Sequence, residues 1–183
     1  MPLFREAREA SVAFNAAKTL AQVVVFWGVF LFVIPPLLVR VERGTPLERF
    51  VFPSIGMLSA GVLFALAGCV GLWSSWEMVA RGRGTPLPLD APRRLVIGGP
   101  YRFVRNPMAC AGLMQGVAIG LYDGSPLVLA YCVAGGIVWN VLVRPLEEAD
   151  LESRFGDEYR AYRRCVRCWI PRVPMPRAKA DER

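Results

Sequence analysis

Four long runs without a charged residue divide this 183-residue chain and constrain its fold more than any other feature. They cover residues 19–39, 50–76, 108–122 and 127–143. As an α-helix the first run would be about 32 Å long, enough to cross a hydrocarbon core about 30 Å thick. Because 54% of all residues are hydrophobic and many lie in these runs, we expect an all-α, polytopic membrane protein with about four transmembrane helices.

The four predicted helices differ in length. Residues 108–122 and 127–143 form short runs of 15 and 17 residues, and the turn sequence Asp123-Gly124-Ser125-Pro126 separates them. They predict a tight antiparallel helical hairpin, with close packing through Gly112, Gly116 and Gly120. The first helix should begin near Ser11, and Pro35-Pro36 should kink or stop it near its far end.

Basic residues are distributed unevenly between the two sides of this predicted bundle. The N-terminal segment, the loop after the second run and the C-terminal tail contain 19 of the 22 Lys and Arg residues. Since Lys and Arg favour the cytoplasmic side, we expect both termini to be cytoplasmic in an inner (cytoplasmic) membrane. The net charge of +7 then indicates anionic membrane lipids as partners, and no nucleic acid.

The cysteines do not predict a metal centre. A structural zinc site needs four ligands, whereas the chain has five Cys and no His, and its one CxxC is formed by Cys165 and Cys168. The context of a thioredoxin-like redox pair is also absent. We therefore interpret Cys165 and Cys168 as part of an interfacial segment and expect no metal.

Two polar segments border the predicted hairpin and contain the candidate site residues. They are Gly98–Met108 (GGPYRFVRNPM) and Arg144–Leu151 (RPLEEADL). Because a hairpin brings its own two ends together, Asn106-Pro107 should lie beside Glu147 and Glu148. These groups could bind a ligand, or the arginines could be membrane anchors that pair with the glutamates.

Apolar and aromatic residues recur at steps of three or four after the second polar segment, and most arginines lie off this stripe. The pattern predicts a C-terminal amphipathic helix at the membrane interface, although Gly156 weakens it locally. The stripe consists of Leu151, Phe155, Tyr159, Tyr162, Val166 and Trp169.

Residues 98–172 resemble the isoprenylcysteine carboxyl methyltransferase and phospholipid methyltransferase superfamily of small membrane enzymes. The shared order is Gly-Pro-Tyr-Arg-Phe-Val-Arg-Asn-Pro-Met, a hydrophobic hairpin, Glu-Glu, Phe-Gly-Asp-Glu-Tyr-Arg-Ala-Tyr and Trp-Ile-Pro-Arg. The resemblance implies an S-adenosylmethionine-dependent methyltransferase whose acceptor is a lipophilic small molecule or lipid, similar to an isoprenylcysteine carboxylate or a phospholipid amine.

The resemblance also implies roles for individual residues. Catalytic roles fall on Arg144, which matches an arginine implicated in substrate handling, and on Glu148. Four residues depart from the family pattern: Asn106 replaces a histidine of the isoprenylcysteine enzymes, Ala109 an aromatic tyrosine and Ala149 a proline, and Cys168 interrupts the usual approach to Trp-Ile-Pro. The implied cofactor-binding residues are Gly98, Gly99, Tyr101, Arg105, Asn106, Pro107, Glu147 and Glu148.

These inferences combine into one expected organisation. We expect a single membrane domain over residues 1–183, with scaffold spans in 11–97, a catalytic-type region in 98–172 and a flexible tail in 173–183. A sulfonium methyl donor needs orientation, worth about 7–11 kcal/mol, and no metal. A neutral acceptor could need Glu147, Glu148 or Tyr101 as a base.

The alternatives to a methyltransferase are a non-catalytic membrane protein on the same scaffold, including one for nitrogen-oxide or respiratory maturation, and an NADPH-dependent reductase of the sterol reductase type.

Overall fold

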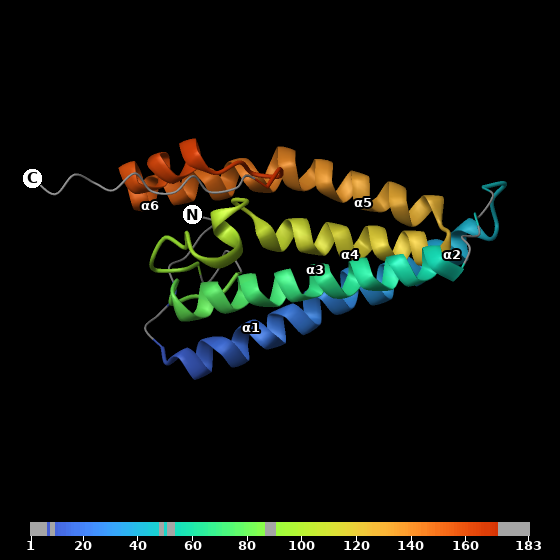
Figure 1. Ribbon diagram of the computed structural model, residues 1–183, viewed down its shortest axis with the longest axis horizontal. Coiled ribbons are helices and arrows are strands. Elements are labelled where there is room, and N and C mark those ends of the chain that lie inside the picture. The colour runs from blue at the N-terminus through green and yellow to red at the C-terminus, as the bar shows by residue number, and fades with distance from the viewer. Residues whose placement is uncertain (1–6, 8–9, 48–49, 51–53, 87–90, 172–183) are drawn as a thin grey trace, which may run out of the picture.

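The computed structural model describes residues 7, 10–47, 50, 54–86 and 91–171, and the regular elements in these ranges are helices (Figure 1). Their order is α1 (Val12–Trp27), η1 (Gly28–Val33), α2 (Ile34–Glu42), α3 (Ser54–Ala80), η3 (Gly99–Arg102), α4 (Pro107–Asp123), α5 (Pro126–Val138), η4 (Trp139–Val143) and α6 (Arg144–Cys165). The expected tail, residues 173–183, lies outside the described residues.

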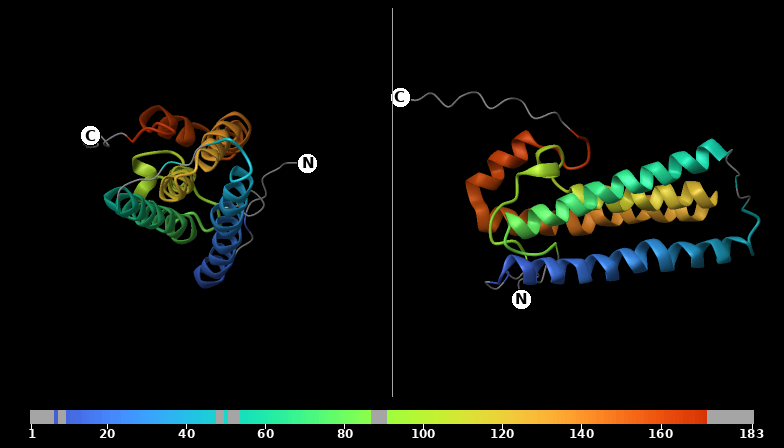
Figure 2. Two further views of the ribbon diagram at one scale, coloured as in Figure 1. Left: turned by 90° about the vertical axis from the view of Figure 1, so that its right-hand side faces the viewer. Right: turned by 60° about the horizontal axis from the view of Figure 1, so that its bottom comes forward.

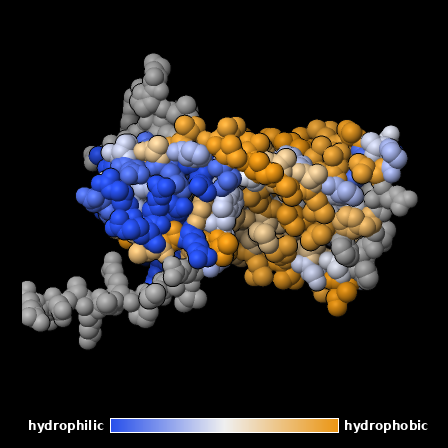
Figure 3. Space-filling view, turned by 90° about the horizontal axis from the view of Figure 1, so that it is seen from above, coloured by the Kyte–Doolittle hydropathy of each residue, from blue (hydrophilic) through white to orange (hydrophobic). Residues whose placement is uncertain are grey.

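Three helical segments are long and apolar enough to cross a membrane: Val12–Glu42, Ser54–Ala80 and Pro126–Cys165. The all-helical membrane fold predicted from the charge-free runs is therefore confirmed. The number of four spans stays a prediction, because α4 has only 17 residues. One end of the bundle presents a hydrophilic surface, while an apolar surface covers much of its length (Figure 3).

The first membrane segment begins where the sequence predicts but does not end at its prolines. The Ser11 hydroxyl accepts a hydrogen bond from the Phe14 amide at 3.2 Å and so caps α1. Pro35 and Pro36 lie near the start of α2, directly after the π-helical η1. The wider π-helical turn accommodates the missing proline amides, so the segment continues to Glu42 and the predicted stop is wrong.

The predicted hairpin is formed by α4 and α5. Gly124 ends α4 in the left-handed region with φ 60°, and the Ser125 hydroxyl accepts a hydrogen bond from the Val128 amide at 3.2 Å. A Cβ atom on Gly116 would lie 2.7 Å from Cys132 Sγ, so glycine allows the two helices to approach closely here. The hairpin brings the start of α4 beside the start of α6.

The central helix α4 packs between α3 and α5, and α2 contacts both hairpin helices. The first helix α1 packs on α3, and its N-terminal end inclines away from α5 (Figure 2).

The C-terminal helix α6 is broken at Gly156, which has φ 50° and ψ −121°. Its second half packs back on the protein: Tyr159 is buried, and the Tyr162 hydroxyl donates to the Tyr101 carbonyl at 2.7 Å. The helix ends at Cys165, so Val166 and Trp169 of the predicted stripe lie beyond it.

Candidate active site

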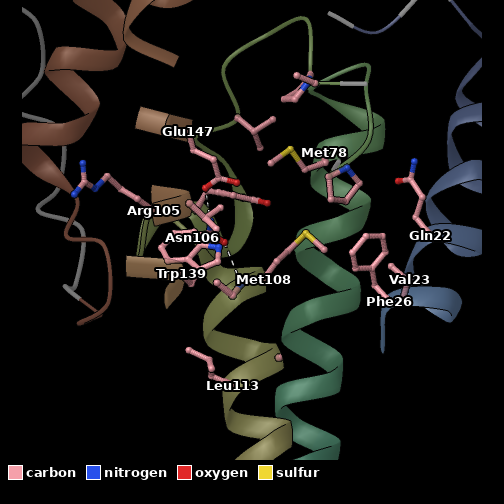
Figure 4. Close-up of a pocket in the computed structure, with 18 of the residues that line it drawn as sticks. Gln22, Val23, Phe26, Met78, Arg105, Asn106, Met108, Leu113, Trp139 and Glu147 are labelled. Atoms are coloured by element: carbon pink, nitrogen blue, oxygen red, sulfur yellow. Dashed lines mark hydrogen bonds between the residues drawn. The ribbon is translucent and has the colours of Figure 1, made fainter. Parts of the chain in front are cut away.

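A cavity of about 500 Å³ lies between α1, the α4–α5 hairpin and residues 91–96, a volume typical of small-molecule sites (Figure 4). Its polar end is lined by Arg105, Asn106 and Glu147. The rest of its wall is largely apolar. Phe26 and Phe30 line this part, are 40% and 48% exposed, and belong to the charge-free run that forms α1 and η1.

Asn106 connects the two polar segments through both ends of its side-chain amide. Its Oδ1 accepts a hydrogen bond from the Ala109 amide at 3.0 Å, which caps α4 before Pro107. Its Nδ2 donates to Glu147 Oε2 at 3.0 Å. Asparagine is among the best residues for starting a helix, and its amide nitrogen remains free to bond elsewhere. The predicted proximity of Asn106 and Glu147 is therefore present in the structure.

The adjacent carboxylates Glu147 and Glu148 have different environments. Glu147 lines the cavity, whereas Glu148 does not. Glu148 pairs with three arginines: Arg105 at 3.1 Å, Arg144 at 3.4 Å and Arg163 at 3.6 Å. The sequence left two interpretations open for these glutamates, ligand binding and pairing with arginines. In the structure Glu147 lines the cavity, where a ligand could reach it, whereas Glu148 is paired with arginines.

Arg105 lies between this ion-pair cluster and the cavity. Its Nη2 contacts Glu148, whereas its Nε and Nη1 are buried and have no hydrogen-bond partner among the described residues. Its backbone amide donates to the Arg167 carbonyl at 2.9 Å, which ties it to the segment after α6. Buried guanidinium donors without partners are costly, and the side chain of Arg105 points away from Asn106 and Glu147 (Figure 4).

Tyr101 contributes a second unpartnered polar atom to the cavity wall. The residue is 4% exposed, and its hydroxyl has no hydrogen-bond partner in the part of the chain that the structure describes. Burial, followed by the neighbouring Tyr162, Glu147 and Glu77, raises the pKa of Tyr101 well above its usual range. The phenol therefore stays protonated at neutral pH and can donate a hydrogen bond.

Gly98 and Gly99 contact the end of α3 and do not line the cavity. A Cβ atom on Gly99 would lie 2.7 Å from Glu77 Cγ, and one on Gly98 would collide with the guanidinium of Arg81. Gly99 also has φ 54°, a conformation that favours glycine. The close approach that two adjacent glycines permit is used here for packing against Glu77 and Arg81.

The cavity brings together part of the predicted site. Tyr101, Arg105, Asn106 and Glu147 line it, whereas Gly98, Gly99, Pro107, Arg144 and Glu148 lie outside its wall. Arg144 instead donates to Asn140 Oδ1 at 2.9 Å. No three His, Cys, Asp or Glu side chains within the described ranges gather where they could hold a metal ion.

Sequence reasoning missed residues of the first two membrane segments. Gln22 of α1 and Met78 of α3 line the cavity on the side opposite Glu147, Arg105 and Trp139 (Figure 4). Gln22 was detectable, because an amide is unusual in a charge-free membrane run. Met78 gave no signal, since methionine is an ordinary apolar residue in such a helix.

The model of a family described as phospholipid methyltransferase matches residues 55–158, more than half of the chain. The matched part runs from α3 into α6 and includes Tyr101, Arg105, Asn106 and Glu147. No curated protein matches the chain.

Proposed function

The chain belongs to the phospholipid methyltransferase family, and on this premise we propose that its cavity binds S-adenosylmethionine beside a lipophilic methyl acceptor. Membership of the family supports a methyltransferase embedded in a membrane. The identity of the methyl donor and that of the acceptor are what we propose here.

The observation that carries the proposal is the set of unpartnered polar atoms at the polar end of the cavity. Arg105, whose Nε and Nη1 have no hydrogen-bond partner among the described residues, would turn towards the cavity and bind the carboxylate of the methionine part of the donor. The Glu147 carboxylate, oriented by Asn106, suits its ribose hydroxyls or amino group. The residues present therefore fit this cofactor, with the Tyr101 hydroxyl as a further donor.

The protein would contribute to the reaction by aligning the donor with the acceptor and by excluding water from the cavity. S-adenosylmethionine, when bound, supplies a methyl group that is already activated by a positively charged sulfur. The apolar part of the cavity would align the acceptor's tail, and Met108 and Trp139 would exclude water near the polar end. Such orientation can contribute about 7–11 kcal/mol. A carboxylate acceptor needs no base, whereas a neutral amine would transfer its proton to Glu147.

We assign supporting roles to the predicted residues outside the cavity wall. Glu148 would position Arg105 through their ion pair, and Arg144 would neutralise the same carboxylate, so both act as positioning residues. Gly98, Gly99 and Pro107 would fix the backbone of the polar segments. Residues 98–172 would form the catalytic-type region on the scaffold of residues 11–97, with α1 adding Gln22 to the wall.

The test is direct binding of the donor to the purified protein in detergent, measured by titration calorimetry. We expect Glu147→Gln to weaken binding of S-adenosylmethionine at least about tenfold, because a charge-assisted hydrogen bond is lost. Glu152→Gln is the matched control, since Glu152 pairs with Arg160 and Arg163 away from the cavity. Absence of binding by the wild type would contradict the proposal.

The acceptor can then be identified from the membrane itself. Membranes that contain the protein would be incubated with methyl-labelled donor, and the extracted lipids would be separated. Label in a lipid fraction that disappears with Glu147→Gln supports the proposal and identifies the acceptor as a carboxylate or an amine. Label that persists at the wild-type level in Glu147→Gln contradicts the assignment of the cavity.

A further inference from the structure

Three arginines line the cavity, and one of them lacks a counter-charge among the described residues. Arg105 pairs with Glu148, and Arg154 pairs with Asp150 at 3.1 Å and also donates to the Pro92 carbonyl. Arg94 is exposed and forms no hydrogen bond or ion pair through its side chain with any residue that the structure describes. Within the part of the chain that the structure describes, Arg94 is therefore the arginine of the cavity wall without a paired carboxylate.

The backbone that presents Arg94 is fixed on the end of α3. The amides of Arg93 and Arg94 both donate to the Gly82 carbonyl, at 2.8 and 3.2 Å. Gly82 leaves no room for a side chain, since a Cβ atom there would lie 2.8 Å from both Pro92 Cβ and Val96 Cγ2. Arg94 is therefore held on a backbone that is fixed to α3, while its exposed side chain has no partner among the described residues that would keep it from turning towards a ligand.

Arg94 lines the same cavity as the apolar residues Phe26 and Phe30, so a ligand that binds it would have both a charged and an apolar part. A lipophilic acceptor with its tail beside Phe26 and Phe30 places its head group at the polar end of the cavity. There, Asp150 is already paired with Arg154, so an anionic group on that head would need a further positive charge in the cavity wall. A guanidinium with free donors suits the oxygens of a phosphate or carboxylate.

We propose that Arg94 is a specificity-determining residue that binds an anionic group, phosphate or carboxylate, on the head of the acceptor. This inference rests on the proposed function, because it treats the cavity as the acceptor site. Two other sources offer the same chemistry: the carboxylate of S-adenosylmethionine and the anionic lipids of the membrane surface. The experiment separates them.

The binding test compares two amphiphiles that differ by one phosphate. Lauroyl lysophosphatidic acid and monolauroylglycerol would be titrated into the full chain in dodecyl maltoside. Quenching of tryptophan fluorescence is the signal, because two of the five tryptophans, Trp27 and Trp139, line the cavity. We expect the wild type to prefer the phosphate-bearing lipid about fivefold, the upper range for a partly exposed ion pair.

Matched variants decide whether Arg94 causes this preference. Arg94→Gln should bind the two amphiphiles equally, and Arg94→Lys should retain part of the preference. Arg102→Gln should retain all of it, because Arg102 is exposed on η3 and does not line the cavity. A preference that survives Arg94→Gln overturns the inference. An equal loss in Arg102→Gln also overturns it, since surface charge would then be the cause.

Calorimetry with S-adenosylmethionine separates this inference from the proposed function. Arg94→Gln should bind S-adenosylmethionine within about twofold of the wild type. A large loss of donor affinity in Arg94→Gln would assign Arg94 to the donor's carboxylate and overturn the inference. If the wild type does not bind the donor, the proposed function fails, whereas an Arg94-dependent phosphate preference still supports recognition of an anionic amphiphile.

Discussion

The amide of Asn106 and the carboxylate of Glu147 are joined by a 3.0 Å hydrogen bond across 41 residues of sequence. The same Asn106 side chain accepts the Ala109 amide, so one residue both starts α4 and orients a carboxylate of the cavity. These two roles can be separated by substitution.

We expect Asn106→Ser to keep the cap and lose the bond to Glu147, because serine caps helices well but is too short to reach that carboxylate. Asn106→Ala loses both interactions and should be less stable than Asn106→Ser by about 1 kcal/mol. Both variants should weaken binding of S-adenosylmethionine similarly. Unfolding in denaturant and calorimetry measure the two effects, and wild-type affinity in Asn106→Ser would contradict the orienting role.

Glu148→Gln should affect stability more than it affects donor binding. It leaves Arg105 and Arg144 without their shared carboxylate, and Glu148 is only 13% exposed, so we expect a loss of about 2 kcal/mol in the free energy of unfolding. Glu152→Gln removes exposed ion pairs and should cost less than about 1 kcal/mol. A larger loss of donor affinity in Glu148→Gln than in Glu147→Gln would reverse our assignment of the two glutamates.

Tyr101→Phe should stabilise the ligand-free protein by up to about 1 kcal/mol, because it removes a buried hydroxyl without a partner, and yet weaken donor binding. The pH dependence should also change. Since the pKa of Tyr101 is raised, the folded protein keeps this proton where the unfolded chain loses it. The wild type should therefore lose stability above about pH 10, and the variant should lose less.

Thermal unfolding with and without S-adenosylmethionine, repeated across this pH range, measures both effects of Tyr101→Phe. Destabilisation of the ligand-free variant would indicate that the hydroxyl serves the fold and not a ligand.

Gly135→Leu should block the acceptor and spare the donor. A Cβ atom on Gly135 has Leu113 Cδ2 as its nearest neighbour at 4.0 Å, so a larger side chain can enter the apolar part of the cavity. We expect labelled methyl transfer to fall while calorimetric donor affinity stays unchanged. Gly61→Leu on α3 is the control, because nothing lies within 4 Å of a Cβ atom there. Weakened donor binding in Gly135→Leu would show that the two sites overlap at this glycine.

The proposed orientation can be tested with Cys165, which is exposed at the end of α6. In a variant with the other four cysteines replaced by alanine, an impermeant maleimide should label Cys165 in inside-out membrane vesicles only. Cys165→Ala with Asp123→Cys, at the opposite end of the bundle, should give the reverse pattern. Labelling of Cys165 in right-side-out vesicles would contradict cytoplasmic termini.

The proximity of the two polar segments followed from sequence because a short hairpin necessarily joins its own ends. The directions in which the side chains point could not be predicted from the sequence. Successive helical residues such as Glu147 and Glu148 point about 100° apart, and the packing of α6 decides which one faces the cavity. That packing depends on Arg105 and Arg163, which are distant from α6's first turn in sequence.

The contributions of α1 and α3 could not be derived for a related reason. Lipid and a neighbouring helix are both apolar environments, so a charge-free run does not show which of its faces meets the protein. Only its polar exception, Gln22, carried a signal. The contact of Gly98 and Gly99 with Glu77 and Arg81 likewise depends on where the loop returns to α3.

An entrance for the acceptor beside Phe26 and Phe30, the exposed aromatic residues of the cavity wall, would have a kinetic consequence. An acceptor that enters there diffuses within the bilayer. The rate at which it meets the enzyme therefore depends on its mole fraction in the bilayer and not on its concentration per volume of solution. Diluting the membrane with inert lipid would slow turnover at constant total acceptor, whereas diluting the vesicles with buffer at a fixed donor concentration would leave turnover per enzyme unchanged.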